Sequence, residues 1–277
     1  MRFKKIYLEI SNICNLNCAF CPGTKRPKKR ICEDEFISLM SKLKGWTEFL
    51  YFHLMGEPLC HPDLQKFLQL AQEFGFKVII TTNGTLLKKQ QNILINAPEL
   101  HKVNISLHAF EANDYHVPFD VYLSDCFAFG KAAEGKKIIV YRLWNKGGAD
   151  ERNNEILSKL REYFPQPWQE LRNGVRIGQK VFLEYGDKFD WPDLTAEEGD
   201  PRIFCYGLRD QIGVLSDGTV VPCCLDHDGD LKLGNLFEED LASILDGDRA
   251  KSIYQGFCNR KATEELCRKC GYARRFK

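Results

Sequence analysis

Long apolar segments are absent from this 277-residue chain, and so is a strong excess of charge of one sign. No stretch reaches the length of a membrane-spanning helix, and the first residues, MRFKKIYLEISN, lack the apolar region of a signal peptide. The formal net charge of +1 gives no electrostatic reason to expect binding to nucleic acid or to a membrane surface. We therefore expect a globular cytoplasmic protein that is long enough to bury a core in one or two domains.

Cysteine, in contrast, is abundant, with twelve residues in a chain that lacks a secretory signal. This combination favours metal ligation in a reducing compartment over disulfide bonds. Seven of the twelve fall into the two motifs described below. We expect the other five to be small buried hydrophobic residues, namely Cys32, Cys60, Cys126, Cys224 and Cys258.

The first motif places Cys14, Cys18 and Cys21 within eight residues at the spacing C-x3-C-x2-C. The alternating run 5–10 predicts a half-buried strand, and the asparagines after it place the three thiols on a loop at the strand's end. Three thiolates suit a [4Fe–4S] cubane with one iron left open. Zinc is the alternative metal, although structural zinc sites take four ligands. A disulfide is disfavoured, because three is an odd number.

Strands and helices alternate through most of the chain. We predict six strands, at residues 5–10, 48–54, 76–81, 103–108, 137–142 and 179–185. Helices are predicted between them, from about 34, then at 62–74, 86–95, 119–133 and 156–164. This order is typical of an α/β fold with a parallel sheet. In a barrel of this kind, polar residues at the carboxyl ends of the strands line the active face.

The motif C-x3-C-x-aromatic-C, with Phe20 as the aromatic residue, resembles the signature of the radical S-adenosylmethionine (radical SAM) enzymes. The resemblance implies a partial (β/α)6, TIM-like barrel, which we assign to residues 1–195. It also implies that SAM binds the open iron of the cluster through its amino and carboxylate groups. Reductive cleavage of SAM would then give a 5′-deoxyadenosyl radical that takes a hydrogen atom from the substrate.

The same resemblance assigns further residues to SAM. The segment Met55-Gly56-Glu57-Pro58 looks like the family's Gly-Gly-Glu-Pro motif, which holds the SAM amino group, with Met55 in place of the first glycine. Asn83 and Ser106 match positions near the SAM ribose or carboxylate, and Arg142 matches an arginine that grips the carboxylate. His108 is expected on the inward face of the fourth strand, as a substrate contact or proton donor, with a structural histidine as the alternative.

A second group of cysteines follows residue 200. Cys205 and Cys223 flank a predicted β-hairpin at 211–222, which gives the pattern C-x12-G-x4-C, and the pair Cys267 and Cys270 comes close to the end of the chain. Four thiols from two distant pairs can hold either a zinc ion or an iron–sulfur cluster.

This second pattern resembles the SPASM extension of radical SAM enzymes in its truncated twitch form. The resemblance implies one auxiliary [4Fe–4S] cluster in a small domain of a hairpin and a helix at 238–245, which we assign to residues 196–277. The alternative that Cys224 or Cys258 replaces one of these four ligands stays open.

Together, the two resemblances imply an enzyme that consumes SAM and oxidises a small molecule, with the auxiliary cluster as the acceptor of an electron. The implied partner is a one-electron reductant of the flavodoxin or ferredoxin type. A peptide-modifying maturase is the alternative function, and a non-catalytic iron–sulfur or zinc protein is a third. We expect His108, the segment 147–200 and the cationic loop 25–30 to determine substrate specificity. Two interpretations of loop 25–30 stay open: it is a solvated surface loop, or it is a lid that attracts an anionic group of the substrate.

Overall fold

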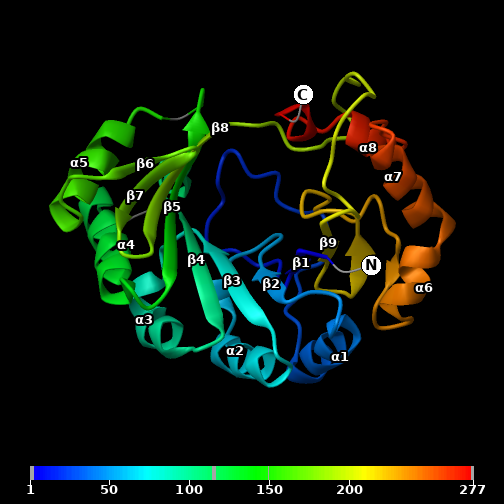
Figure 1. Ribbon diagram of the computed structural model, residues 1–277, viewed down its shortest axis with the longest axis horizontal. Helices are drawn as coiled ribbons and strands as arrows, with labels where there is room; N and C mark the ends of the chain where they lie inside the picture. Colours follow the sequence, from blue (N-terminus) through cyan, green and yellow to red (C-terminus); the bar gives the residue numbers. More distant parts are fainter. Residues whose placement is uncertain (1–2, 114–116, 149, 276–277) are drawn as a thin grey trace.

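The computed structural model of the protein describes residues 3–113, 117–148 and 150–275. Six parallel strands lie side by side in chain order and form a curved wall: β1 (Lys5–Leu8), β2 (Phe49–Phe52), β3 (Lys77–Thr82), β4 (Leu100–Ser106), β5 (Ile138–Lys146) and β8 (Val181–Asp187). Five helices lie along the outside of this wall (Figure 1): α1 (Glu33–Leu43), α2 (Leu64–Glu73), α3 (Leu87–Asn96), α4 (Phe119–Ala133) and α5 (Asn153–Tyr163). The predicted partial (β/α)6 barrel is confirmed. No helix within these ranges is long and apolar enough to cross a membrane.

The alternation of side chains along each strand decides what the barrel interior contains. Ile6 and Leu8 of β1 are fully buried in the main hydrophobic core, which also holds Phe36 of α1. Lys5 and Tyr7 of the same strand line the interior cavity instead. Because successive side chains of a strand point to opposite faces, one face of β1 anchors the helices and the other is free to bind ligands.

The sheet differs from the prediction in two places. Strand β4 ends at Ser106, so His108 lies on the short 3-10 turn η2 (Leu107–Ala109) rather than on a continuing strand. A hairpin of β6 (Gln169–Leu171) and β7 (Gly174–Gly178) was not predicted, and it pairs antiparallel with β8. All three residues of β6 are exposed, so β6 lacks the apolar alternation that predicts a strand, whereas β7 has a short one in Val175 and Ile177.

The predicted C-terminal hairpin is confirmed as β9 (Gln211–Val214) and β10 (Thr219–Val221). Strand β9 pairs parallel with β1, and the short β11 (Gly234–Asn235) follows β10, so that the auxiliary segment extends the barrel sheet. The helix expected at 238–245 is α6 (Leu241–Asp246). Two further helices complete the segment, α7 (Asp248–Cys258) and α8 (Glu265–Arg268).

A buried carboxylate joins the cysteine loop to this auxiliary segment. Glu9 follows β1, its side chain is 0% exposed, and Arg26 donates to both of its oxygens at 2.8 and 2.7 Å. The same carboxylate accepts the backbone N–H and the hydroxyl of Ser216, at 3.1 and 2.8 Å. The hypothesis that loop 25–30 offers free cations is therefore wrong for Arg26, and Lys29 is likewise paired with Glu35 at 2.6 Å.

Replacing Glu9 with Ala is expected to lower the free energy of unfolding by about 3–5 kcal/mol, because it leaves the Arg26 guanidinium buried without its partner. Anaerobic urea unfolding followed by circular dichroism measures this loss. The matched control is Glu155→Ala, since Glu155 also forms a bidentate pair with an arginine, Arg152, but on the surface. That change is expected to cost about 1 kcal/mol or less. Equal losses in the two variants would contradict the anchoring role of Glu9.

Candidate active site

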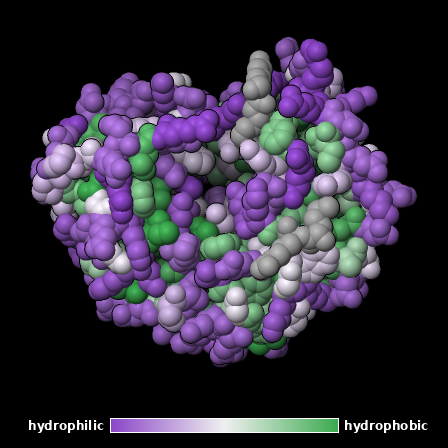
Figure 2. All heavy atoms as spheres, in the orientation of Figure 1, coloured by the Kyte–Doolittle hydropathy of each residue, from purple (hydrophilic) through white to green (hydrophobic). Residues whose placement is uncertain are grey.

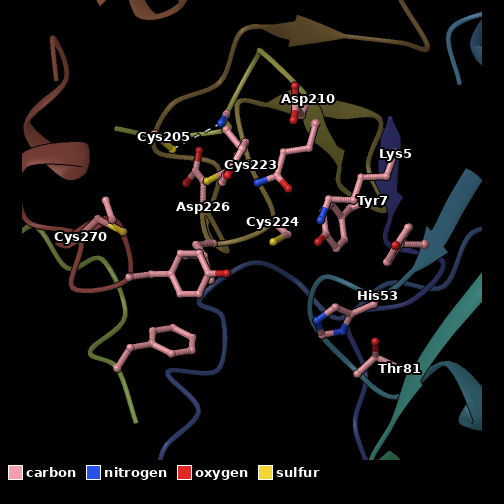
Figure 3. A pocket seen from close by; sticks show the side chains of 18 of the residues that line it. Lys5, Tyr7, His53, Thr81, Cys205, Asp210, Cys223, Cys224, Asp226 and Cys270 are labelled. Carbon is pink, nitrogen blue, oxygen red and sulfur yellow. Dashed lines mark hydrogen bonds between the residues drawn. The ribbon is translucent and has the colours of Figure 1, made fainter. Parts of the chain in front are cut away.

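A cavity of about 880 Å³ lies between the inner face of the barrel and the auxiliary segment. The hollow is visible in the middle of the molecule in Figure 2. Ser106 at the carboxyl end of β4, His108 on the turn after it and Arg142 in the middle of β5 line part of it, so Arg142 does not lie at the strand's end as predicted. The four cysteines of the second motif line another part. Figure 3 shows Cys205, Cys223 and Cys270 across the cavity from His53 and Thr81 of the barrel. Of the first motif, Phe20 lines the cavity as well, so the cavity lies between the cysteine loop and the auxiliary thiols.

The three thiols of the first motif lie together on the loop between β1 and α1. Cys14 and Cys21 both raise the pKa of Cys18, which reaches about 11 mainly through burial. Two N–H groups point at sulfur, from the Leu16 backbone to Cys14 at 3.4 Å and from the Asn113 amide to Cys18 at 3.1 Å. Neighbouring thiols with N–H donors are the surroundings that an iron–sulfur cluster needs, so these residues fit the predicted centre.

Gly56 lies against this loop rather than against a ligand. Its φ is +76°, and a Cβ on it would meet the backbone oxygen of Ser11 at 2.3 Å and the backbone of Asn12 and Ile13 at 2.9 Å. The next residue, Glu57, donates its backbone N–H to the oxygen of Ile13 at 3.0 Å. The glycine of the Met55–Pro58 segment therefore lets the second βα turn pack directly on the cysteine loop. Pro58 follows as the first residue of the 3-10 turn η1 (Pro58–Cys60).

Replacing Gly56 with Ala is expected to lower the free energy of unfolding by about 2–5 kcal/mol, from backbone strain and from the clash with Ser11. Because the clash falls on the cysteine loop, the variant is also expected to hold less iron after anaerobic reconstitution. The matched control is Gly75→Ala, where φ is +84° but no atom lies within 4 Å of the added Cβ. Loss of iron in both variants, or in neither, would contradict the packing role of Gly56.

Glu57 and Asn83 hold the cysteine loop from the side of the barrel. The Glu57 carboxylate is buried and accepts the backbone N–H groups of Leu59 and Asn83, at 3.0 and 2.7 Å, while burial raises the pKa of Glu57 to about 7. The Asn83 amide donates to Asn15 at 3.0 Å and lies 3.8 Å from the sulfur of Cys14. Neither residue lines the cavity. Their predicted contacts with SAM stay predictions.

Ser106 and Arg142 are neighbours across the β4–β5 ladder, and both line the cavity. The Nε of Arg142 is buried and has no hydrogen-bond partner among the described residues, although an oxygen of Glu184 lies 3.5 Å away. A buried donor without a partner is costly, so it marks a place where an anionic ligand is expected. This arrangement supports the predicted contact between Arg142 and the SAM carboxylate without testing it.

His108 lies in the same part of the cavity, with its ring 5.2 Å from the ring of Phe20 on the cysteine loop. Burial lowers the pKa of His108 to about 4, and the charge of Arg142 adds to this effect. Its Nδ1 is 3.1 Å from the backbone oxygen of Arg142. A histidine held neutral in this way is poorly suited to donate a proton at neutral pH. The contact with Phe20 favours a role as a wall of the site.

The four thiols of the second motif are also brought together, although they lie up to 65 residues apart in the sequence. Cys205, Cys224, Cys267 and Cys270 each raise the pKa of Cys223, in addition to the effect of burial. The backbone N–H of Gly207 donates to the sulfur of Cys205 at 3.3 Å. This set of thiols fits an auxiliary cluster.

The alternatives to these four ligands are Cys224 and Cys258. Cys258 is exposed at the end of α7 and does not line the cavity. Cys224 lines it, but its neighbour is Tyr7, with the phenol oxygen directed toward the thiol in Figure 3. Cys224 also raises the pKa of Cys205 and Cys223, so it stays an alternative ligand beside the predicted four.

The cysteines outside the two motifs were expected to be buried, and this is wrong for most of them. Only Cys126 is buried, whereas Cys32 and Cys258 are exposed and Cys60 and Cys224 are partly exposed.

Within the described ranges, no group of three or more His, Cys, Asp or Glu side chains is placed to hold a single metal ion. Each cysteine of a cubane binds a different iron, so its sulfurs stay further apart than the ligands of one ion. A four-cysteine zinc site would instead need all four sulfurs at about 2.3 Å from one point.

Several cavity residues were not singled out from the sequence. They are polar or aromatic side chains on the inward positions of β1, β2 and β4, or just beyond their ends: Lys5, Tyr7, Tyr51, His53 and Lys102. The sequence did contain a signal for their inward position: they alternate along the strands with the apolar residues that face the helices, so they must point to the other face of the sheet. The sequence alone did not show that this inner face lines a cavity.

Comparison with known families agrees with both halves of this arrangement. The sequence profile of the Radical SAM superfamily matches residues 8–169, and the profile of the SPASM iron–sulfur cluster-binding domain matches residues 205–271. Neither match crosses the boundary after residue 195, which stays a prediction.

Two curated relatives illustrate the range of similar proteins. The S-adenosyl-L-methionine-dependent 2-deoxy-scyllo-inosamine dehydrogenase of Niallia circulans is 21% identical, over 97% of this chain and 92% of its own length. The tungsten-containing aldehyde ferredoxin oxidoreductase cofactor-modifying protein of Pyrococcus furiosus is 29% identical over 50% of this chain. That match spans only 39% of the Pyrococcus protein.

Solved structures show the same fold. BtrN, in complex with AdoMet and 2-DOIA, covers 98% of this chain and 94% of its own with a TM-score of 0.62 at 19% identity. Streptococcus suis SuiB gives a TM-score of 0.65 at 19% identity, covering 98% of this chain and 72% of its own. The superfamily profile covers more than half of the chain, on the segment that carries the first three thiols. The protein therefore belongs to the radical SAM superfamily and carries a SPASM segment, and its cofactors are SAM and [4Fe–4S] clusters.

Proposed function

We propose that this enzyme binds SAM beside the cysteine loop and oxidises a small molecule held in the cavity. When bound, SAM and the N-terminal cluster supply a 5′-deoxyadenosyl radical that takes a hydrogen atom, and a single auxiliary cluster supplies an acceptor for the electron that the substrate then gives up. The continuity of the cavity carries the proposal. Phe20 of the cysteine loop and Arg142 line the same space as Cys205 and Cys267, so a substrate held there lies between the cysteine loop and the auxiliary thiols.

The residues of the chain have separate tasks in this proposal. Cys14, Cys18 and Cys21 hold the first cluster, and the four cysteines of the second motif hold the other. Arg142 offers its Nε, which has no hydrogen-bond partner among the described residues, to the SAM carboxylate. The carboxylate of Glu57 accepts two backbone N–H groups and has further lone pairs that can accept the SAM ammonium. Phe20 and the neutral His108 pack together at the cavity wall, where they limit the access of water to a reactive intermediate.

A peptide substrate is the second candidate. The Niallia relative is named for a small molecule, 2-deoxy-scyllo-inosamine, whereas SuiB has been solved bound to its precursor peptide SuiA. Both folds resemble this chain to a similar degree, so the fold does not separate the two substrate classes. A short open reading frame beside the gene, whose product stimulates SAM cleavage, would favour the peptide.

Two further parts of the proposal concern the surroundings of the enzyme. Cleavage of SAM needs electrons one at a time, so we expect a flavodoxin-like or ferredoxin-like reductant. The cytoplasm is the expected compartment, because all twelve cysteines are free thiols and two sets of them fit metal clusters that a reducing environment protects.

The direct test is anaerobic incubation of the reconstituted protein with SAM and dithionite, followed by chromatography for 5′-deoxyadenosine. Formation of 5′-deoxyadenosine is expected. With a substrate in hand, deuterium from the substrate is expected in 5′-deoxyadenosine, with one molecule of it per molecule of oxidised product. Return of the label to the product, with regeneration of SAM, would rule out the oxidation. No 5′-deoxyadenosine from protein with intact clusters would favour a non-catalytic role.

A further inference from the structure

The interior of the barrel carries more positive charge than the proposed SAM site uses. Lys5 on β1, Lys102 on β4 and Arg142 on β5 all line the cavity. They lie close enough to disfavour one another's charged forms, since Arg142 and Lys5 both lower the pKa of Lys102, and Arg142 lowers that of Lys5. Like charges gathered in a partly desolvated space are unfavourable unless an anion joins them.

The protein supplies little negative charge against these three cations. Glu184 lies 3.5 Å from the Nε of Arg142 and 4.0 Å from the Nζ of Lys102, whereas the acidic groups that raise the pKa of Lys5 are Cys224 and Asp210. Lys5 forms no ion pair or hydrogen bond through its ammonium within the described residues. Its Nζ lies instead over the rings of Tyr7 and Tyr51, at 5.2 and 5.4 Å. Figure 3 shows Lys5 and Tyr7 side by side on the wall of the cavity.

The other charged groups of the cavity leave this excess in place. Lys4 is paired with Asp210 at 2.7 Å. The carboxylate of Asp226 accepts the backbone N–H groups of Asp230 and Leu231, both at 2.9 Å. The negative charge of Asp226 is offset by the positive charge of Lys188, an exposed residue that also lines the cavity.

SAM does not account for the excess either. SAM has one carboxylate, one ammonium and one sulfonium, so it adds net positive charge even when its carboxylate binds Arg142.

We propose that Lys5 and Lys102 form a subsite for an anionic group of the substrate, a carboxylate or a phosphate. The two lysines come from the inner face of separate strands, and the aromatic rings beneath Lys5 leave its ammonium without a protein anion. A carboxylate or phosphate between them neutralises the repulsion and accepts hydrogen bonds from both. The anionic attraction that the sequence suggested for loop 25–30 is thus assigned to the barrel wall. This inference rests on the proposed function, because it takes the cavity to hold SAM and substrate together.

The test uses probes small enough to enter the cavity without matching the shape of the unidentified substrate. Anaerobically reconstituted protein, saturated with SAM, is titrated with inorganic phosphate, acetate, acetamide and methylammonium, and binding is measured by calorimetry and by thermal shift. Phosphate or acetate is expected to bind with saturation, while neutral acetamide and cationic methylammonium give no saturable signal. Preference between phosphate and acetate identifies which anion the substrate carries. Affinity should fall as salt is raised.

Variants separate the subsite from a general effect of anions. The double change Lys5→Gln with Lys102→Gln is expected to weaken anion binding at least tenfold, and Lys5→Arg should retain it. The matched control is Lys77→Gln, since Lys77 also lies over an aromatic ring, that of Phe49 at 5.5 Å, but is paired with Glu48 at 2.6 Å. Anions that bind no better than acetamide, or that bind the double variant as well as the unaltered protein, would overturn the proposal.

These titrations do not depend on turnover. Failure to bind anions with normal formation of 5′-deoxyadenosine would therefore reject the subsite alone, and the reverse pattern would reject the proposed function alone.

Discussion

Replacing Cys14, Cys18 or Cys21 with alanine is expected to reduce the formation of 5′-deoxyadenosine to background. A cubane bound by three thiolates has no spare ligand, so the loss of any one releases or distorts the cluster that SAM must reach. Chromatography of 5′-deoxyadenosine gives the activity, and iron analysis is expected to show the loss of about four of about eight irons per chain. The visible absorption of the remaining auxiliary cluster should persist.

The control for this series is Cys258→Ala. Cys258 is an exposed thiol at the end of α7, away from the cavity, and its removal is expected to leave iron content and SAM cleavage unchanged. Retention of SAM cleavage by any variant of the first three thiols would contradict the assignment on which the reaction depends. Loss of iron in Cys258→Ala would instead make that residue a ligand.

Replacing Cys267 with Ala is expected to spare SAM cleavage without product and to stop turnover of the substrate. Cys267 belongs to the set of thiols on the auxiliary side of the cavity, where the nearby Cys205 raises its pKa. Removing it eliminates the acceptor that the oxidation needs and leaves the cysteine loop intact. Comparison of 5′-deoxyadenosine with product, each quantified by mass spectrometry, measures this uncoupling.

Cys224→Ala is the matched control on the auxiliary side, because Cys224 lines the same cavity next to Cys223 but contacts Tyr7. It is expected to keep the iron of the auxiliary cluster. Unchanged turnover in Cys267→Ala would show that the second centre is only a structural clip. Loss of the auxiliary iron in Cys224→Ala would move one ligand position to that residue.

The cysteine loop shows how a local pattern can predict a site. Cys14, Cys18 and Cys21 are so close in the chain that one loop must hold them together, whatever surrounds it. The alternation before them predicts β1, so their place at the end of a strand also followed from the sequence. Where the prediction went further, to His108 on a continuing strand, it was wrong, because the strand ends at Ser106 and a 3-10 turn follows.

Contacts between distant parts of the chain could not be predicted in this way. Glu9 and Ser216 are 207 residues apart, and only the parallel pairing of β9 with β1 brings them within 2.8 Å. Loop 25–30 was read either as a solvated loop or as a cationic lid, and neither reading foresaw that Arg26 forms a buried ion pair with Glu9. The short, exposed strand β6 was missed because it carries no apolar alternation.

The sequence by itself determined the parallel barrel, the family and the seven thiols, because strand periodicity and close cysteine spacing are properties of short segments. The packing of the strands in space brought Phe20 of the cysteine loop and the four auxiliary thiols to one cavity. It also gathered Lys5, Lys102 and Arg142 there and set Glu184 beside the last two. The physical reason is that the partners of a side chain depend on which strands become neighbours and in which register, and in this sheet those neighbours come from opposite ends of the chain.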